Sequence, residues 1–167
     1  MTRYILAAVL LAASAHAKAQ ERTVALPAEA SDGQQARLLL IVNEHNTFLP
    51  DQVKWTLLPK GSAADWPISF DVKLMRGRHS ACETHTTPRR IVCDLSRSAS
   101  CSFSWLMSHE LLHAIGMAHR HGGIMDPVCS GHYSGVDPET IAEVGRHYRP
   151  ITGSVDEVAA ILNGRKP

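Results

Sequence analysis

Three histidines and a glutamate in the second half of the chain have the spacing of a metal site. The stretch reads His109-Glu110-Leu111-Leu112-His113-Ala114-Ile115-Gly116-Met117-Ala118-His119. Side chains four residues apart lie on one face of an α-helix, about 6 Å apart along its axis, so the imidazoles of His109 and His113 can bind one metal ion. Glu110 stands between them, close enough to hold a water molecule at that metal.

A glycine in the same stretch indicates how a third ligand could reach the metal. Gly116 stands where a helix could end in a left-handed turn, which residues with a Cβ resist. Such a turn would bring the chain back and let His119 supply a third nitrogen. Three protein ligands leave one position of tetrahedral zinc open, which is typical of a catalytic site. We therefore predict one zinc ion bound by His109, His113 and His119, with Glu110 as the catalytic residue.

The pattern HExxHxxGxxH resembles the signature of the metzincin metallopeptidases, which carry a methionine-containing turn after the third histidine. The segment Gly123-Ile124-Met125-Asp126-Pro127 is similar to that turn. The resemblance implies that Met125 packs beneath the imidazoles without binding the metal. Pro127 is typical of the matrixin branch, and the segment that begins at Asp137 resembles the start of the matrixin C-terminal helix.

The resemblance also implies a fold. We expect an α+β domain with a small, twisted, mostly parallel sheet, an antiparallel edge strand, an active-site helix and a C-terminal helix. An extended protein or peptide substrate would lie along the edge strand, for which residues 79–82 are the candidate. Trp105 would limit the depth of the main specificity pocket, or else belong to the core. Calcium is not indicated, and His79 and His85 are expected to be surface histidines.

The reaction expected from these residues is peptide-bond hydrolysis, in which Glu110 takes a proton from zinc-activated water and delivers it to the leaving amine. Three alternatives remain. The third ligand could be a downstream glutamate, Glu139 or Glu143. The protein could be an exported zinc-binding module without turnover. It could also be an interaction protein of the same class whose cleft is blocked around Arg120 and Asp126.

The beginning of the chain has the pattern of a signal peptide. Arg3 precedes an apolar run over residues 5–13, and Ala17 and Ala19 are small residues suited to cleavage. The run is shorter than the ~20 residues that a membrane span needs, which disfavours an uncleaved anchor. We expect cleavage after Ala19, with Ala17 as the alternative. Residues 20–167 would then form a single catalytic domain, exported to a periplasm or to the medium.

The charges of the chain are nearly balanced. It has 17 Lys and Arg residues and 16 Asp and Glu residues, and loss of Arg3 and Lys18 with the signal peptide would leave a net charge of −1. This balance gives no electrostatic reason to expect nucleic acid or membrane partners, and we expect a monomer. Five arginines between positions 76 and 97 could favour acidic substrates if they border the cleft, although a solvated basic face is the commoner case.

Four cysteines, Cys82, Cys93, Cys101 and Cys129, indicate two disulfides in an exported chain. Three pairings are possible. We favour Cys82 with Cys93, which would close a hairpin. Cys101 with Cys129 follows, because the residue before the metal-binding helix and the residue after the methionine turn must both approach the site. A cysteine that binds zinc in a latent form is disfavoured, because no propeptide of useful length is present.

Hydrophobic periodicity and capping residues predict the remaining elements. Strands are expected over residues 23–26, 53–58, 68–74, 77–82 and 90–95. The resemblance favours a helix over about 32–45 with Asp32 as its cap. Ser100 or Ser102 should cap the metal-binding helix, and Asp137 should cap the next, with Ile141, Val144 and Tyr148 on its apolar face. A last helix is expected from Ser154.

Overall fold

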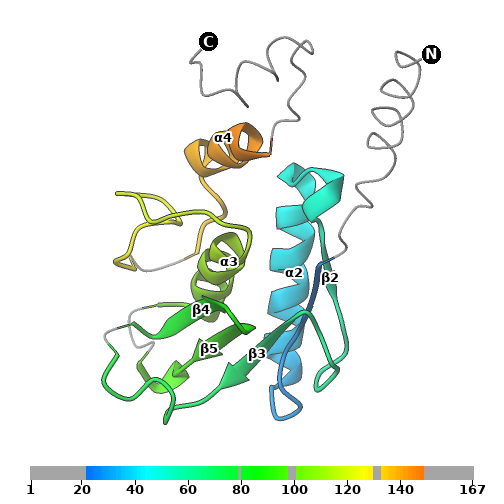
Figure 1. Cartoon of the computed structure of the whole chain (residues 1–167), viewed down its shortest axis with the longest axis vertical. Helices are drawn as coiled ribbons and strands as arrows, with labels where there is room; N and C mark the ends of the chain where they lie inside the picture. Colours follow the sequence, from blue (N-terminus) through cyan, green and yellow to red (C-terminus); the bar gives the residue numbers. More distant parts are fainter. Residues whose placement is uncertain (1–21, 79, 98–100, 130–132, 149–167) are drawn as a thin grey trace, which may run out of the picture.

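The computed structural model describes residues 22–78, 80–97, 101–129 and 133–148, and within them it has an α+β architecture (Figure 1). The predicted signal peptide, the helix expected from Ser154, and the residues His79 and Ser100 lie outside these residues. None of the helices in the described ranges has the length and apolar character needed to cross a membrane.

Among the described residues, five strands form one sheet in the order β2-β1-β3-β5-β4. Their bounds are β1 Arg22–Ala25, β2 Trp55–Leu57, β3 Trp66–Phe70, β4 Cys82–Thr86 and β5 Arg89–Cys93. Strand β1 runs parallel to β2 and β3, β3 runs parallel to β5, and β4 alone is antiparallel to its neighbour. This confirms the prediction of a mostly parallel sheet with an antiparallel edge strand.

In the described part of the chain, three α-helices accompany the sheet: α2 Asp32–Phe48, α3 Phe103–Ala114 and α4 Pro138–His147. Helix α2 contacts β2 near one edge of the sheet, α3 contacts β4 at the other edge, and the two helices contact each other. They therefore cover the same face. Buried apolar side chains from the sheet and from both helices form one core, in which Trp55 and Trp66 meet edge to face at 6.4 Å.

The cap predicted for α2 is wrong by one residue. The side chain of Ser31 accepts a hydrogen bond from the Gln34 backbone, and the Gln34 side chain accepts one from the Ser31 backbone. This reciprocal capping box makes Ser31 the cap and leaves Asp32 as the first helical residue. Asp32 instead forms an exposed ion pair with Lys60 at 2.7 Å.

The strand predicted over residues 68–74 ends at Phe70. The Asp71 side chain accepts hydrogen bonds from the backbone of Lys73 and Leu74, which turns the chain away from the sheet. The alternating pattern that suggested a longer strand continues outside the sheet, where Val72 and Leu74 are 59% and 50% exposed.

The hairpin before α3 is also shifted along the sequence. Of the strand predicted over residues 77–82 and the edge candidate at residues 79–82, only Cys82 belongs to a strand among the described residues, because the edge strand is β4. The turn of the hairpin is only Thr87-Pro88, between the paired residues Thr86 and Arg89. Polar side chains on β4 gave the segment the composition of a loop, but an edge strand can place such side chains at the surface.

A buried histidine connects α2 to α3. His45 is fully buried, and its Nε2 lies 2.7 Å from the hydroxyl of Ser108, the residue before the first predicted ligand. Tyr133 contacts the same hydroxyl at 3.4 Å and donates a hydrogen bond to Glu44, the neighbour of His45. Burial lowers the pKa of His45 to about 3, so this ring is neutral in the folded protein.

Because His45 is neutral in the folded protein, we expect the fold to lose stability in mild acid. In the unfolded chain a histidine has a pKa of about 6.5, so below that pH the unfolded state binds a proton that the folded state does not. This contribution to stability is complete above pH 6.5 and is lost as the pH falls toward 3. From this group we expect a loss of about 1.4 kcal/mol per pH unit below pH 6.

Urea unfolding of the metal-free protein at pH 7.5 and pH 5 would measure the effect. The free energy of unfolding should depend less on pH in His45→Gln than in the wild type. His121→Gln, which changes an exposed histidine, should keep the full dependence. An equal pH dependence in wild type and His45→Gln would contradict the prediction.

Candidate metal centre

The C-terminal half of helix α3 carries two of the predicted metal ligands, His109 and His113. Ser102 is the cap of this helix, because the Ser102 side chain accepts a hydrogen bond from the Trp105 backbone at 3.1 Å. The helix ends as the sequence predicts: Gly116 has a φ of +92°, in the left-handed region. The backbone of Gly116 donates to the His113 carbonyl and that of Met117 donates to the Leu112 carbonyl, which is the Schellman arrangement.

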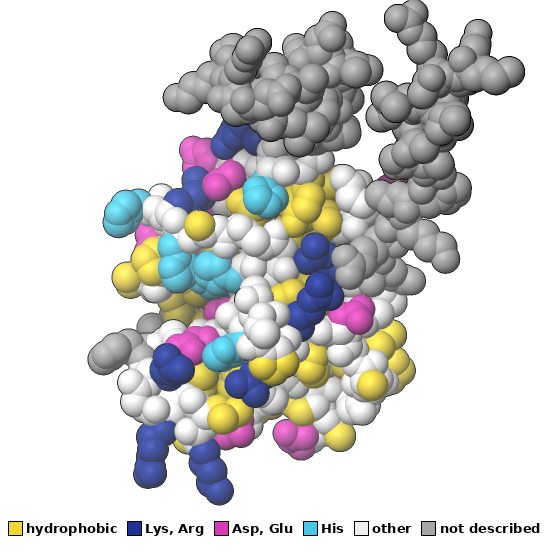
Figure 2. All heavy atoms as spheres, viewed as in Figure 1, with side chains coloured by type: hydrophobic (Ala, Val, Ile, Leu, Met, Phe, Trp, Pro, Cys, Tyr) yellow, Lys and Arg dark blue, Asp and Glu magenta, His cyan; other side chains and the backbone are white. Residues whose placement is uncertain are grey.

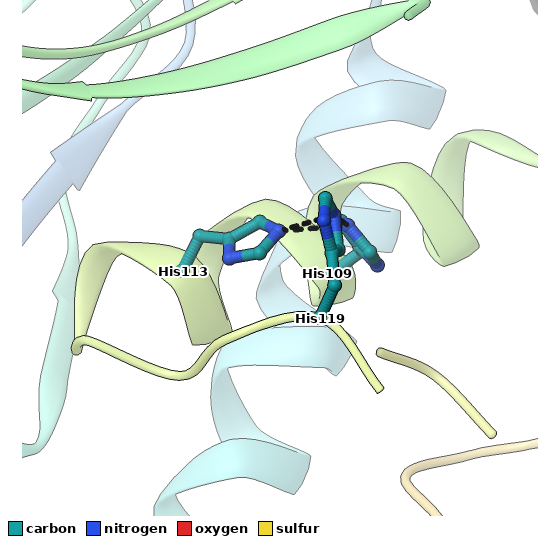
Figure 3. A group of neighbouring side chains, drawn as sticks. All are labelled: His109, His113 and His119. Carbon is teal, nitrogen blue, oxygen red and sulfur yellow. Dashed lines mark hydrogen bonds between the residues drawn. The ribbon is translucent and has the colours of Figure 1, made fainter. Parts of the chain in front are cut away.

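This turn brings His119 back toward His109 and His113, so that the three predicted ligands lie together (Figure 3). The Nε2 atoms of His109 and His113 are 2.9 Å apart, those of His113 and His119 are 3.0 Å apart, and those of His109 and His119 are 3.2 Å apart. Among the described residues, these three histidines form a group whose potential ligand atoms all lie within 4.8 Å of one another. The structure therefore brings together the residues that the motif predicts.

The backbone determines which nitrogen of two rings faces the centre. His109 Nδ1 lies 2.6 Å from the Ile124 carbonyl oxygen, and His113 Nδ1 lies 2.7 Å from the Met117 carbonyl oxygen. A carbonyl can only accept a hydrogen bond, so each Nδ1 carries the proton and each Nε2 has a free lone pair. Desolvation lowers the pKa of His109 to about 4 and also lowers that of His113, which favours the neutral form that binds metal.

The donor set and its spacing suit one metal ion. Lone pairs that face each other at about 3 Å repel, and a cation at their common centre removes the repulsion. Tetrahedral zinc with bonds of about 2.0–2.1 Å places its nitrogen ligands roughly 3.3 Å apart, slightly more than the separations found here. Three imidazole nitrogens are a donor set that zinc and several other transition metals accept.

The alternative third ligands face a different partner. Glu139 Oε2 lies 3.6 Å from Arg120 Nη1, and Glu143 Oε2 lies 4.0 Å from Arg120 Nε. Neither glutamate belongs to the three-histidine group. Arg120 itself pairs with Asp137 and donates to the Thr140 hydroxyl at 2.7 Å. The residue that follows His119 therefore contacts the start of α4, and it does not line the cleft.

Asp137 joins α4 to the methionine turn. Its carboxylate caps α4 by accepting from the Thr140 backbone at 2.9 Å, and it also accepts from the Ile124 backbone at 2.8 Å. Burial raises the pKa of Asp137, but these hydrogen bonds and the charge of Arg120 outweigh burial and lower it to about 2. Gly123 has a φ of +69°, and a Cβ there would lie 2.2 Å from Asp137 Oδ2, so only glycine fits.

Met125, the residue after Ile124, is fully buried. Its backbone carbonyl accepts a hydrogen bond from the Arg120 backbone at 3.0 Å. On α4, the predicted apolar face is only partly correct. Val144 is buried, and the Tyr148 hydroxyl donates to the Ile115 carbonyl, whereas Ile141 is 37% exposed. The polar residue Thr140 takes the buried place because its hydroxyl binds Asp137 and Arg120.

Glu110 lies beside the three histidines with its side chain almost entirely buried. One carboxylate oxygen, Oε2, accepts a hydrogen bond from the Thr84 hydroxyl at 2.6 Å. Desolvation raises the pKa of Glu110 to about 7, although the Thr84 bond acts in the opposite direction. Nothing in the metal motif marks Thr84, but it stands two residues after Cys82 on an alternating strand, a position that faces the same side of the sheet.

A cleft of about 920 Å³ runs past these residues. Its walls are residues 80–86 on one side and α3 with residues 127–129 on the other. Figure 2 shows histidine side chains gathered on this face of the molecule, just above the position of β4 in Figure 1. Neither Arg120 nor Asp126 lines the cleft. The arrangement that the blocked-cleft alternative requires around these two residues is thus not found.

Trp105 belongs to both of the environments considered for it. It lines the cleft, yet it is only 6% exposed and its ring stacks on His109 at 4.7 Å. His85 also lines the cleft and is half-buried, with Nε2 3.8 Å from Glu83. It is not part of the three-histidine group.

Two of the five clustered arginines border the cleft, and each faces an acidic residue. Arg78 lies 3.7 Å from Glu83, and Arg97 lies 3.0 Å from the buried carboxylate of Asp94. Arg89 lies over the ring of Trp66, 5.9 Å from its centroid. Because the two cleft arginines are already paired, their charges give little support to a preference for acidic substrates.

Both predicted disulfides are confirmed. Cys82 pairs with Cys93 across β4 and β5, and Cys101 pairs with Cys129 beside the cleft. Disulfides persist in oxidising compartments, so the pairs indicate an extracellular type of environment.

No protein-family model and no curated protein matches the chain.

Proposed function

We propose that this protein is an exported zinc-dependent endopeptidase of the metzincin type. The observation that carries the proposal is the convergence of three imidazoles, two of them held with Nε2 unprotonated, beside a buried glutamate in an open cleft. A structural zinc site would be closed by a fourth protein ligand. A zinc-buffering module would have no need of Glu110 or of the cleft.

The chemistry divides between the metal and the chain. Zinc, when bound, would act as a Lewis acid that polarises the scissile carbonyl and lowers the pKa of the attacking water. The attacking water gives a proton to the Glu110 carboxylate while its oxygen bonds to the carbonyl carbon. Glu110 then gives that proton to the leaving amine as the C–N bond breaks. Burial of Glu110 favours this double role, because by raising its pKa it makes the carboxylate a stronger base toward water.

The edge strand β4 suits an extended peptide. The Asp94 backbone donates to the Ala81 carbonyl at 2.7 Å, and Cys82 and Cys93 approach to 4.1 Å between Cα atoms. In an antiparallel pair this pattern makes Cys82, Thr84 and Thr86 non-hydrogen-bonded positions, whose backbone N–H and C=O groups point away from β5. These groups face the free edge of the sheet, where a substrate strand could add hydrogen bonds.

Cleavage of a mixed peptide library by the zinc-loaded, disulfide-bonded protein would test the proposal. We expect cleavage that a zinc chelator abolishes and that one equivalent of zinc restores, whereas calcium or magnesium does not. Mass spectrometry of the products would show which residue the pocket selects. Cleavage that survives complete metal removal would contradict a metallopeptidase, and zinc binding without any cleavage would favour the binding module.

A further inference from the structure

Thr84 is a cleft residue outside the metal motif, and its hydroxyl holds the side chain of Glu110. Thr84 Oγ1 lies 2.6 Å from Glu110 Oε2 and 3.0 Å from the Glu110 carbonyl oxygen. In its ionised form, which is the form that acts as a base, the Glu110 carboxylate can only accept, so the hydroxyl donates. A donor–acceptor distance of 2.6 Å is typical of the short, strong hydrogen bonds that hydroxyl groups form with charged oxygens.

We propose that Thr84 is a positioning residue for Glu110, which directs the carboxylate toward the attacking water. This inference rests on the function proposed above. A glutamate side chain has three rotatable bonds, and the bond at Oε2 restricts them. The other oxygen, Oε1, is then the one that takes and returns the proton. Precise placement is valuable because a displacement of about 1 Å in such a group can cost roughly 100-fold in rate.

Strand β4, which carries the Thr84 hydroxyl, is held in place by its neighbours and is a different element from the helix that carries Glu110. Thr84 pairs with the fully buried Ile91 on β5, and the Cys82–Cys93 disulfide joins the same two strands two residues away. Helix α3 carries Glu110 together with His109 and His113, whereas Thr84 comes from the opposite wall of the cleft. The hydrogen bond therefore ties the position of Glu110 to the position of the edge strand.

The backbone of Thr84 connects its hydrogen bond with Glu110 to substrate binding. Thr84 is one of the β4 positions whose N–H and C=O groups point to the free edge of the sheet. An extended peptide that pairs with β4 would contact this backbone, while the side chain of the same residue holds Glu110. The distance between the bound peptide and the general base is thus set through a single residue.

Steady-state cleavage by three variants tests the role of the hydroxyl. Thr84→Val removes the hydroxyl and keeps the β-branched shape, and Thr84→Ser keeps the hydroxyl and removes a methyl group. Thr47→Val removes a threonine hydroxyl from the exposed side of α2, at a residue that does not line the cleft. We expect kcat to fall roughly 10- to 100-fold in Thr84→Val with KM within about twofold of the wild type. Thr84→Ser and Thr47→Val should stay within about threefold.

A second measurement reports the contact without any turnover. The side-chain carboxyl carbon of Glu110 can be observed by NMR in metal-free protein labelled with ¹³C-glutamate, and Glu110→Gln assigns its signal by removing it. The signal should move in Thr84→Val and stay close to its wild-type position in Thr84→Ser. Zinc content and melting temperature, measured for every variant, separate a positioning effect from loss of metal or fold.

The outcomes distinguish this inference from the function on which it rests. A wild-type enzyme that depends on Glu110, together with an unchanged kcat in Thr84→Val, would overturn the inference and leave the proposed function intact. Equal losses in Thr84→Val and Thr84→Ser would overturn it too, because a variant that keeps the hydroxyl would then be impaired as much as one that lacks it. Absence of any Glu110-dependent cleavage would overturn the proposed function itself, and with it the catalytic meaning of the Thr84 bond.

Discussion

Replacing Glu110 by glutamine is expected to abolish peptide cleavage and to leave zinc binding intact. Glutamine has the same shape and can still accept the Thr84 hydrogen bond through its amide oxygen, but it cannot take a proton from water. Loss of a general base typically costs 10²- to 10⁴-fold, so kcat should fall by at least about 100-fold. Zinc affinity should change little, because the Glu110 carboxylate is not among the grouped ligand atoms.

The measurement is kcat on a peptide identified from the library, with zinc content determined on the same samples. Glu83→Gln is the matched control, since Glu83 lines the same cleft but has no part in the proposed proton transfer. It should retain activity to within about threefold. Near-normal turnover by Glu110→Gln would exclude Glu110 as the base.

Removing the imidazole of His119 should have the second large effect, on zinc affinity. Loss of a residue that merely orients a metal ligand costs about 10- to 100-fold in affinity, so loss of a ligand should cost more than 100-fold. His119 is also the ligand that α3 does not carry, and its position depends on the turn at Gly116. Competition titration with a zinc-binding dye would compare His119→Ala with the wild type.

Two further sets of variants are needed to interpret this titration, one as a control and one to test the alternative ligands. His121→Ala removes an exposed histidine two residues further on and should bind zinc like the wild type. Glu139→Gln and Glu143→Gln test the alternative third ligands, which face Arg120 in the structure. If His119→Ala bound zinc normally while one of the glutamate variants did not, the third ligand would have to be reassigned.

The features that could be predicted from sequence are those that depend on a few neighbouring residues. The spacing of His109 and His113 follows from the helical repeat, and the need for Gly116 follows from its left-handed backbone. Asp137 and Pro138 mark the start of α4 by their own side chains. The Cys82–Cys93 pair was predictable because a hairpin brings such residues together.

The errors arose where a distant contact or a local competitor decided the outcome. Asp71 ends β3 because its side chain binds the following backbone, although the apolar alternation continues. Strand β4 was predicted too early in the sequence, because its polar side chains resemble a loop until they are placed at a sheet edge. The bond between Thr84 and Glu110 joins residues 26 positions apart, and no pattern within either segment indicates it.

The disulfide between Cys101 and Cys129 has a thermodynamic consequence for the whole site. It closes a ring of chain with a sequence separation of 28, and that ring contains all three predicted ligands, Glu110 and Met125. In the chain-entropy model, a ring of this size removes roughly 3–4 kcal/mol of conformational freedom from the unfolded state. When the oxidised protein unfolds, its imidazoles therefore stay within one short loop, and the entropy that must be lost to gather them around a metal again is correspondingly smaller.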